Sequence, residues 1–267
     1  MADIASNASL PRRGRDRHAL WRGLAVPAGL IVLWTIAARL PGNHSQLLVP
    51  LDTVLAAPFV DDSGREIWLG LAQSVARLAA GFSIGAIAGV AFGLFTGMSQ
   101  SADRAIGPSV HALRQITLFA WIPLLSAWFG NGESAKIVFI VLSAFFPTAL
   151  NTHEGLRAIP VQYLELANVM NFSRRQRVLR LLLPGALPSI FVGIQVALIS
   201  GWIGTVGAEY MLGVGRGLGI FIAEARGQFR MDLVLVGVLM LALVGFAINT
   251  VCRRVFRHLL RWQGGTS

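Results

Sequence analysis

The sequence is poor in charged residues and in cysteine, and both shortages exclude classes of protein. Only 13% of the 267 residues are charged, whereas soluble domains carry about 25%. The chain lacks the polar surface needed to face water on all sides, so we expect it to reside in a membrane. Its single cysteine, Cys252, excludes an intramolecular disulfide, and nothing in the sequence suggests a zinc site.

Lysine is as scarce as cysteine, because Lys136 is the only one. A phosphate-binding loop ends in Gly-Lys-[Ser/Thr], but Lys136 follows Ala135. We therefore expect no ATP hydrolysis by this chain, and its energy must come from a partner or an ion gradient. The glycine-rich segment GVGRGLG (213–219) also lacks the glycine spacing of a nucleotide-binding loop. We expect a flexible outer turn there.

Long apolar segments take the place of the missing charge. Apolar residues make up 54% of the chain, and its mean hydropathy is +0.62. About 20 consecutive apolar residues cross the hydrocarbon core as a helix. Six segments meet that length: Trp21–Leu40, Trp68–Met98, Gly107–Phe129, Ala135–Thr152, Ser189–Met211 and Leu233–Cys252. The sequence thus predicts an all-α integral membrane protein with six transmembrane helices.

The formal net charge of +10 suggests a nucleic-acid partner until the charges are placed along the chain. Most of the 23 basic residues fall in alternate loops and in the two tails, which the positive-inside rule makes cytoplasmic. We therefore predict membrane orientation and no nucleic-acid binding. The six-helix domain spans 21–252, between a cytoplasmic tail (1–20) and a basic cytoplasmic tail (253–267). No convincing cleavage site follows the first segment, so we expect an uncleaved helix.

The second apolar segment carries glycines at every fourth position. They are Gly81, Gly85, Gly89, Gly93 and Gly97. This spacing places them on one helix face, where small residues let another helix approach closely. We predict a packing face in a many-helix bundle.

A basic insertion at about 154–188 interrupts the apolar pattern. Residues typical of helix ends occur there in order: Pro160 at a first start, Asn171 at a first end, a Ser173–Gln176 capping box at a second start, and Pro184 at a second end. In the second helix, the arginines share one face and the apolar residues another. We predict a helix–turn–helix on the cytoplasmic surface. It could lie on anionic lipid headgroups or dock a cytoplasmic protein, and its composition suits both.

The same stretch, EGLRAIPVQYLELANVMNFSRRQRVLRLLLPGALPSI, resembles the cytoplasmic loop of permease subunits of binding-protein-dependent ABC importers. That family's pattern is Glu-Ala-Ala, then Gly, then an apolar-Leu-Pro ending. Glu165 and Ala167 match it, Leu166 replaces the first Ala, Asn171 replaces the Gly, and Leu183-Pro184 closes it in register. The segments 113–152 and 217–239 resemble the nitrate/sulfonate/taurine branch, with the aliphatic-sulfonate permeases closest.

This resemblance implies a type I ABC importer permease fold in the bacterial inner membrane, as one half of a homodimeric core. Each copy would dock one of two cytoplasmic ATPase subunits, which bind ATP and Mg, and a periplasmic or lipid-anchored binding protein would deliver the solute. The chain itself would be a transport subunit with no catalytic residue and no metal. The coupling residues carried over are Glu165, Leu166, Ala167, Asn171, Phe172, Leu183 and Pro184.

Polar residues within the membrane are costly and are therefore functional candidates. The candidates for the translocation pathway are Arg77, Gln115, Trp121, Gln195 and Glu209. Arg77 could present positive charge to an anionic sulfonate or snorkel toward the outer end of its span. Glu209 would repel an anion, so a structural pairing or a contact with the binding protein suits it better. Interface anchoring is the simpler interpretation of Trp121.

Other solutes and other classes of protein compete with the sulfonate permease. Taurine, nitrate or another small nutrient is an alternative solute. A secondary transporter would use acidic residues near the middle of its spans and inverted repeats, and the sequence offers neither clearly. An intramembrane enzyme would need a group of catalytic side chains, such as His/Asp/Glu or Ser/Lys, within the membrane. His111 and Ser109 lack a nearby partner motif of that kind.

Overall fold

The computed structural model describes residues 29–39, 49–59 and 61–259, and the chain divides into two compact units after Thr53. The first unit contains the helix Gly29–Arg39, in which the Trp34 indole donates a hydrogen bond to the Val49 carbonyl at 3.0 Å. The rest of the first predicted span, Trp21–Leu40, lies outside the described residues.

The second unit, Val54–Ser267, contains helices and no strands in its described part, which confirms the all-α prediction. The helix α2 (Leu51–Ala56) crosses the boundary, and short 3-10 turns occupy η1 (Ala57–Phe59) and η2 (Leu118–Trp121). The helices of the second unit are α3 (Asp61–Met98), α4 (Gln100–Gln115), α5 (Ile122–Phe129), α6 (Glu133–Arg157), α7 (Val161–Val169), α8 (Arg174–Arg177), α9 (Leu183–Leu212), α10 (Leu218–Gly227) and α11 (Met231–Leu259). A π-helical turn, η3 (Val178–Leu182), joins α8 to α9.

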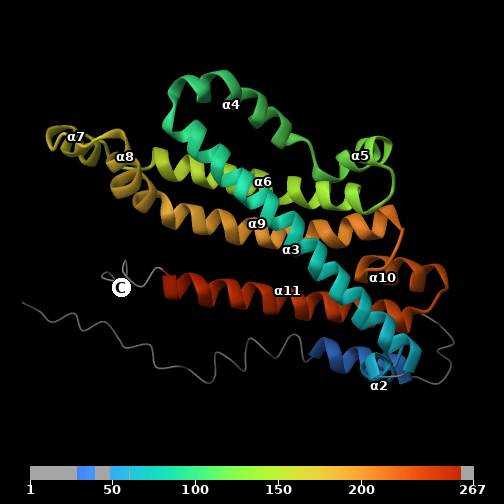
Figure 1. Ribbon diagram of the computed structural model, residues 1–267. Coiled ribbons are helices and arrows are strands. Elements are labelled where there is room, and N and C mark those ends of the chain that lie inside the picture. The colour runs from blue at the N-terminus through green and yellow to red at the C-terminus, as the bar shows by residue number, and fades with distance from the viewer. Residues whose placement is uncertain (1–28, 40–48, 60, 260–267) are drawn as a thin grey trace, which may run out of the picture. The chain divides into compact units, whose positions relative to one another are not determined.

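The helix α6 lies between α3 and α9 and forms the centre of the bundle (Figure 1). The glycine row of α3 faces α6, so closely that a Cβ on Gly85 would lie 2.5 Å from the Val141 carbonyl oxygen. On its other side, α6 meets glycines of α9, where a Cβ on Gly193 would lie 2.7 Å from the Asn151 Cβ. Small residues let these backbones approach closely, as is usual between membrane helices.

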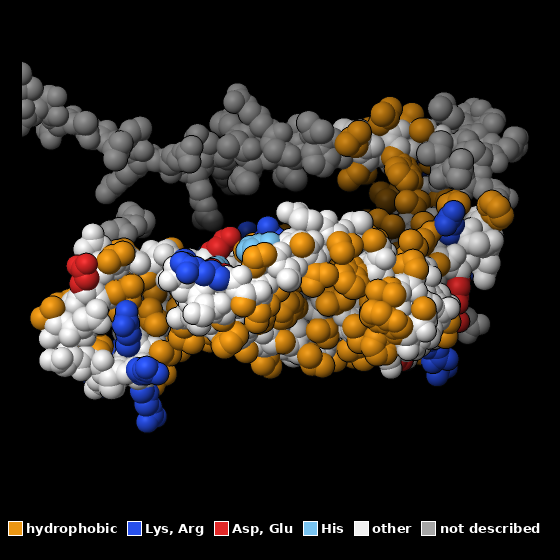
Figure 2. Space-filling view, turned by 90° about the horizontal axis from the view of Figure 1, so that it is seen from above, with side chains coloured by type: hydrophobic (Ala, Val, Ile, Leu, Met, Phe, Trp, Pro, Cys, Tyr) orange, Lys and Arg blue, Asp and Glu red, His pale blue; other side chains and the backbone are white. Residues whose placement is uncertain are grey.

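Among the described residues, four helices are long and apolar enough to cross a membrane: Gly64–Met98, Glu133–Arg157, Arg174–Leu212 and Met231–His258. They correspond to the second, fourth, fifth and sixth predicted spans. Apolar side chains on their exposed surfaces include Ile87 and Phe246, and Figure 2 shows such side chains spread over one face. A protein in water rarely exposes so broad an apolar surface.

The third predicted span, Gly107–Phe129, is wrong as a single helix. The chain bends by 96° between Gln100–Gln115 and Leu118–Phe129. Ile116 and Thr117 adopt extended backbone angles there. Pro123 follows in the first turn of α5, where its missing N–H and fixed φ suit a helix start and oppose continuation of an earlier helix. Counting this bent pair as one span gives up to five.

The prediction that Pro184 ends a helix is also wrong, because one helix runs from Arg174 to Leu212. The π-helical turn before Pro184 resolves the conflict. The Leu183 N–H bonds the Val178 carbonyl, five residues back. The wider turn accommodates a proline that has no N–H for the regular pattern. The segment α8 therefore continues directly into the α9 span.

Candidate functional site

The helices α7 and α8 form a tight pair at one end of the bundle (Figure 1). The helix α7 ends in a Schellman motif: the Phe172 N–H bonds the Ala167 carbonyl at 3.0 Å, and the Asn171 N–H bonds the Asn168 carbonyl at 3.0 Å. Asn171 has the left-handed φ of 51° that this motif requires. Asparagine is, after glycine, the residue most often found there.

A capping box begins α8 directly after this turn. The Ser173 N–H donates to the Gln176 side chain at 2.9 Å, and the Gln176 N–H donates to the Ser173 hydroxyl at 3.3 Å. A side-chain hydrogen bond from Arg177 to Asn168, at 3.4 Å, links α8 back to α7. Local hydrogen bonds therefore set the angle between the two helices.

The residues predicted for coupling divide into an exposed set and a supporting set. Glu165 is exposed, and the apolar side chains exposed around it are Val161, Tyr163, Leu166, Val169 and Met170. Ala167 is only 4% exposed. Phe172, Leu183 and Pro184 are half-buried, and Leu183 packs against the core formed by Leu156, Ala186 and Ile190. Glu165 and Leu166 are therefore available to a partner, whereas Ala167 and Leu183 support the loop.

At the other end of the bundle, Arg77 and Glu209 form a buried ion pair. The Arg77 Nη1 lies 2.6 Å from the Glu209 Oε1, and the two side chains are 7% and 0% exposed. The Arg77 Nε also lies 2.5 Å from the Glu133 carboxylate, which is 55% exposed. Lys136, fully buried, lies 3.3 Å from the same carboxylate. The charge of Arg77 is thus balanced by two acids, and Arg77 does not snorkel to the surface.

The glycine-rich segment 213–219 contacts this charge cluster, with residues 213–216 exposed and 217–219 buried. Lys136 donates to the Val214 carbonyl, the Leu218 N–H donates to the Ser74 hydroxyl at 2.9 Å, and the Gly219 N–H donates to the Glu209 carboxylate at 2.9 Å. A Cβ on Gly217 would lie 2.4 Å from the Glu209 carboxyl carbon. Glycine allows this approach because it has no side chain.

The other pathway candidates lie elsewhere in the bundle. Gln115 is exposed at the last residue of α4. Trp121 is half-buried and packs against a core cluster that includes Ile122 and Phe139. The Gln195 amide donates to the Asn249 side chain at 3.3 Å, linking α9 to α11. Among these five candidates, Arg77 and Glu209 are the pair that the structure joins by a hydrogen bond.

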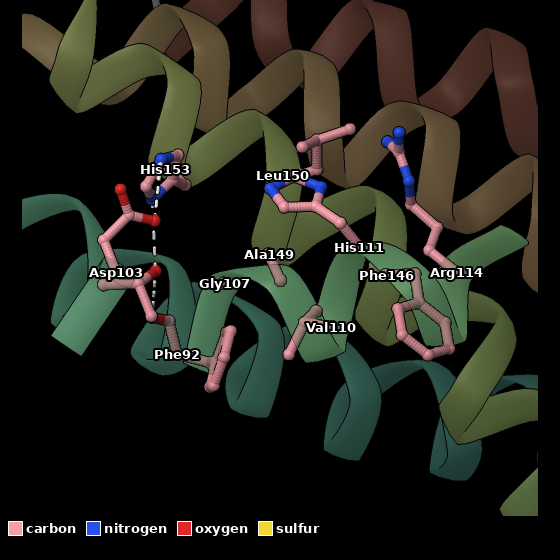
Figure 3. A pocket seen from close by; sticks show the side chains of 11 residues that line it. Phe92, Asp103, Gly107, Val110, His111, Arg114, Phe146, Ala149, Leu150 and His153 are labelled. Atoms are coloured by element: carbon pink, nitrogen blue, oxygen red, sulfur yellow. Dashed lines mark hydrogen bonds and ion pairs between the residues drawn. The ribbon is translucent and has the colours of Figure 1, made fainter. Parts of the chain in front are cut away.

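A pocket between α3, α4 and α6 contains polar groups that were not among the predicted site residues (Figure 3). The Asp103 carboxylate accepts a hydrogen bond from Arg157 at 2.6 Å and lies 3.6 Å from the His153 Nε2. The His153 Nδ1 lies 3.2 Å from the Thr96 hydroxyl. These residues come from three helices, so no local sequence pattern could join them. The sequence signal that could have found part of this pocket is the helical spacing of Asp103, His111 and Arg114, which places them on one face of α4.

A bundle of apolar spans with a paired-helix loop at one end defines a multi-pass membrane protein, and comparisons with known proteins give its family. The family model described as "Binding-protein-dependent transport system inner membrane component" matches residues 84–263. The chain is 35% identical to the putative aliphatic sulfonates transport permease protein SsuC of Bacillus subtilis, over 97% of this chain and 94% of that one. It is 32% identical to the bicarbonate transport system permease protein CmpB of Synechococcus elongatus, over 89% and 88% of the two chains.

A chain of the MetNI methionine ABC transporter, solved in an inward-facing conformation, has the same fold. The TM-score is 0.57 at 22% identity, and the match covers 73% of this chain and 99% of that one. The protein belongs to the family of binding-protein-dependent transport system inner membrane components. It is a permease subunit of an ABC importer, which is a transport component and not the ATP-hydrolysing one.

Proposed function

We propose that this permease conducts a small anion, an aliphatic sulfonate, into the bacterial cytoplasm. The names of its relatives support this solute class, because alkanesulfonate and bicarbonate are both small anions. The working assembly contains a second copy of this chain, two ATPase subunits that bind ATP and Mg, and a periplasmic or lipid-anchored binding protein. Both termini are cytoplasmic, in keeping with the basic residues of the tails and of the α7–α8 loop.

The exposed face of α7 carries the proposal that ATPase subunits dock on this loop. Tyr163, Leu166 and Met170 are spaced by three and four residues, and each is more than half exposed. An apolar helix face left exposed on the cytoplasmic side is an interaction surface. Glu165 lies beside this face and adds a charge that a partner groove can pair.

The connection of α8 to α9 suggests how docking moves the pore. A Schellman turn and a capping box hold α7 to α8, and α8 continues without a break into the α9 span. When the ATPase pair closes on ATP, a docked α7 moves with it. Because α8 and α9 are one helix, that movement reaches the membrane as a tilt of α9 instead of being lost in a flexible linker.

To test docking, the tagged permease is purified and the amount of ATPase that co-purifies is compared between wild type and variants of α7. Glu165→Lys and Leu166→Asp should each weaken ATPase binding by about a hundredfold, since an unmatched charge in an interface costs several kcal/mol. Arg65→Gln, an exposed residue at the opposite end of the bundle, is the matched control and should retain the ATPase. Normal ATPase retention in both docking variants would refute docking through α7.

The solute is tested separately, in proteoliposomes that contain the whole assembly and its binding protein. Uptake of a labelled alkanesulfonate should depend on ATP and exceed the uptake of taurine, nitrate and bicarbonate. A preference for one of those three would correct the solute and leave the importer intact. ATP-independent, ion-driven uptake would refute the proposed energy source.

A further inference from the structure

The polar face of α4 is a feature that the coupling loop and the buried ion pair do not explain. Gly107 is the only buried residue of this 16-residue helix. Asp103, Gly107, His111 and Arg114 recur at intervals of three or four and line the pocket between α3, α4 and α6. A transmembrane segment that exposes such residues is unsuited to lipid. This face must meet water or protein.

The two ends of the pocket differ in how their charges are balanced. At one end, Asp103 pairs with Arg157 and lies beside His153. At the other end, His111 and Arg114 form no hydrogen bond or ion pair with any residue that the structure describes. Figure 3 shows both of these side chains extending toward the same side of α4. This end of the pocket therefore carries positive charge with no acid to balance it.

Arg114 is exposed, but it lies level with the middle of the bundle. It lines the pocket together with Phe146, which is at the middle of α6. The chain leaves the helical conformation two residues later, at the 96° bend between α4 and α5. Irregular backbone at membrane depth is tolerated only where protein buries it or where it lines a water-filled cavity. Transporters form their solute sites at such broken helices.

The buried cations Arg77 and Lys136 are already paired with acids. Arg77 pairs with Glu133 and Glu209, and Lys136 bonds Glu133 and the Val214 carbonyl. Neither has positive charge left to offer an anion. Arg114 does, beside the broken span, and the His111 imidazole lines the same end of the pocket.

We propose that His111 and Arg114 form an anion subsite on the translocation pathway, next to the α4–α5 break. The ligand is the sulfonate head, or another small oxyanion, in transit. Phe92 and Phe146 contribute apolar wall to this pocket, and a less polar surrounding strengthens the attraction between opposite charges. This inference rests on the proposed function in one respect, that the solute is an anion.

The first experiment measures alkanesulfonate uptake by the whole assembly in proteoliposomes. Arg114→Gln should lower the uptake rate by about tenfold or more, because a cationic lining raises the local anion concentration by that order. Arg114→Lys should restore much of the rate. Arg104→Gln is the matched control, since Arg104 is exposed on the same helix but does not line the pocket. ATPase binding should be unchanged in all three variants. Equal uptake by Arg114→Gln and wild type would overturn the subsite.

The second experiment is independent of which solute is carried. The chain has one cysteine, so Cys252→Ala gives a cysteine-free background. In that background, Val110→Cys places a thiol in the pocket with Arg114 intact. An anionic methanethiosulfonate should react with it about tenfold faster than a cationic one, relative to a free thiol. Adding Arg114→Gln should abolish this preference.

The outcomes separate the two proposals. A preference for the anionic reagent that Arg114→Gln removes supports the subsite, even if the wild type carries no sulfonate and the proposed solute is wrong. Equal reaction with both reagents overturns the subsite even if sulfonate uptake is normal. Reaction only with a membrane-permeant maleimide would show that the pocket faces lipid, and would also overturn it.

Discussion

Removing the Arg77 guanidinium should destabilise the fold far more than removing its exposed partner, Glu133. Arg77→Met would leave the fully buried Glu209 carboxylate with Ser74 and the Gly219 N–H as its partners. Removing one member of a buried ion pair costs about 3–5 kcal/mol. Glu133 is 55% exposed, so Glu133→Gln should cost about 1 kcal/mol or less.

The assay is thermal unfolding of the purified protein, followed by the fluorescence of its seven tryptophans. At about 2–4 °C per kcal/mol, Arg77→Met should lower the midpoint by roughly 6 °C or more and Glu133→Gln by no more than about 4 °C. The double variant Arg77→Met/Glu209→Gln should recover most of the loss, because the amide is neutral and still accepts from Gly219. A double variant as unstable as Arg77→Met, or a larger loss in Glu133→Gln, would refute the reasoning.

Two further predictions concern the backbone. Asn171→Gly should keep the thermal midpoint and ATPase retention close to wild type, whereas Asn171→Val should lower both, because a β-branched residue at φ 51° is strained by about 1–3 kcal/mol. Equal behaviour of the two variants would contradict the need for a left-handed residue. Gly85→Val should cost about 3 kcal/mol and reduce the yield of folded protein, because its Cβ would lie 2.5 Å from the Val141 carbonyl oxygen. Gly227→Ala is the control, with nothing within 4 Å of the added Cβ, and similar yields for the two would count against close packing of α3 on α6.

The α7–α8 turn shows how much of this protein is local. Asn171 at the helix end and Ser173 with Gln176 at the next start were recognisable because each motif joins residues at most five apart. Such contacts depend on the chain's own geometry and need no partner from elsewhere. The glycine row of α3 was equally visible as a packing face, although the sequence did not identify α6 as the helix it packs against.

The errors arose where a residue's effect depends on a wider context. Pro184 was expected to end a helix, but a π-helical turn before it keeps the helix continuous. The third span was expected to be one helix, because apolar length alone does not reveal the bend after Gln115. The sequence also did not reveal that Glu209 lies against the glycines of the segment 213–219, since that contact comes from the fold.

Membrane residence, helical class and the internal geometry of the α7–α8 turn were determined by the sequence itself. They follow from hydropathy and from contacts between near neighbours in the chain. Only the tertiary structure decided which charges are balanced. Arg77 and Glu209 are 132 positions apart and meet because α3 and α9 bring them together, whereas His111 and Arg114 meet no acid among the described residues. The field around a charge depends on groups brought close by folding, and sequence distance does not measure that proximity.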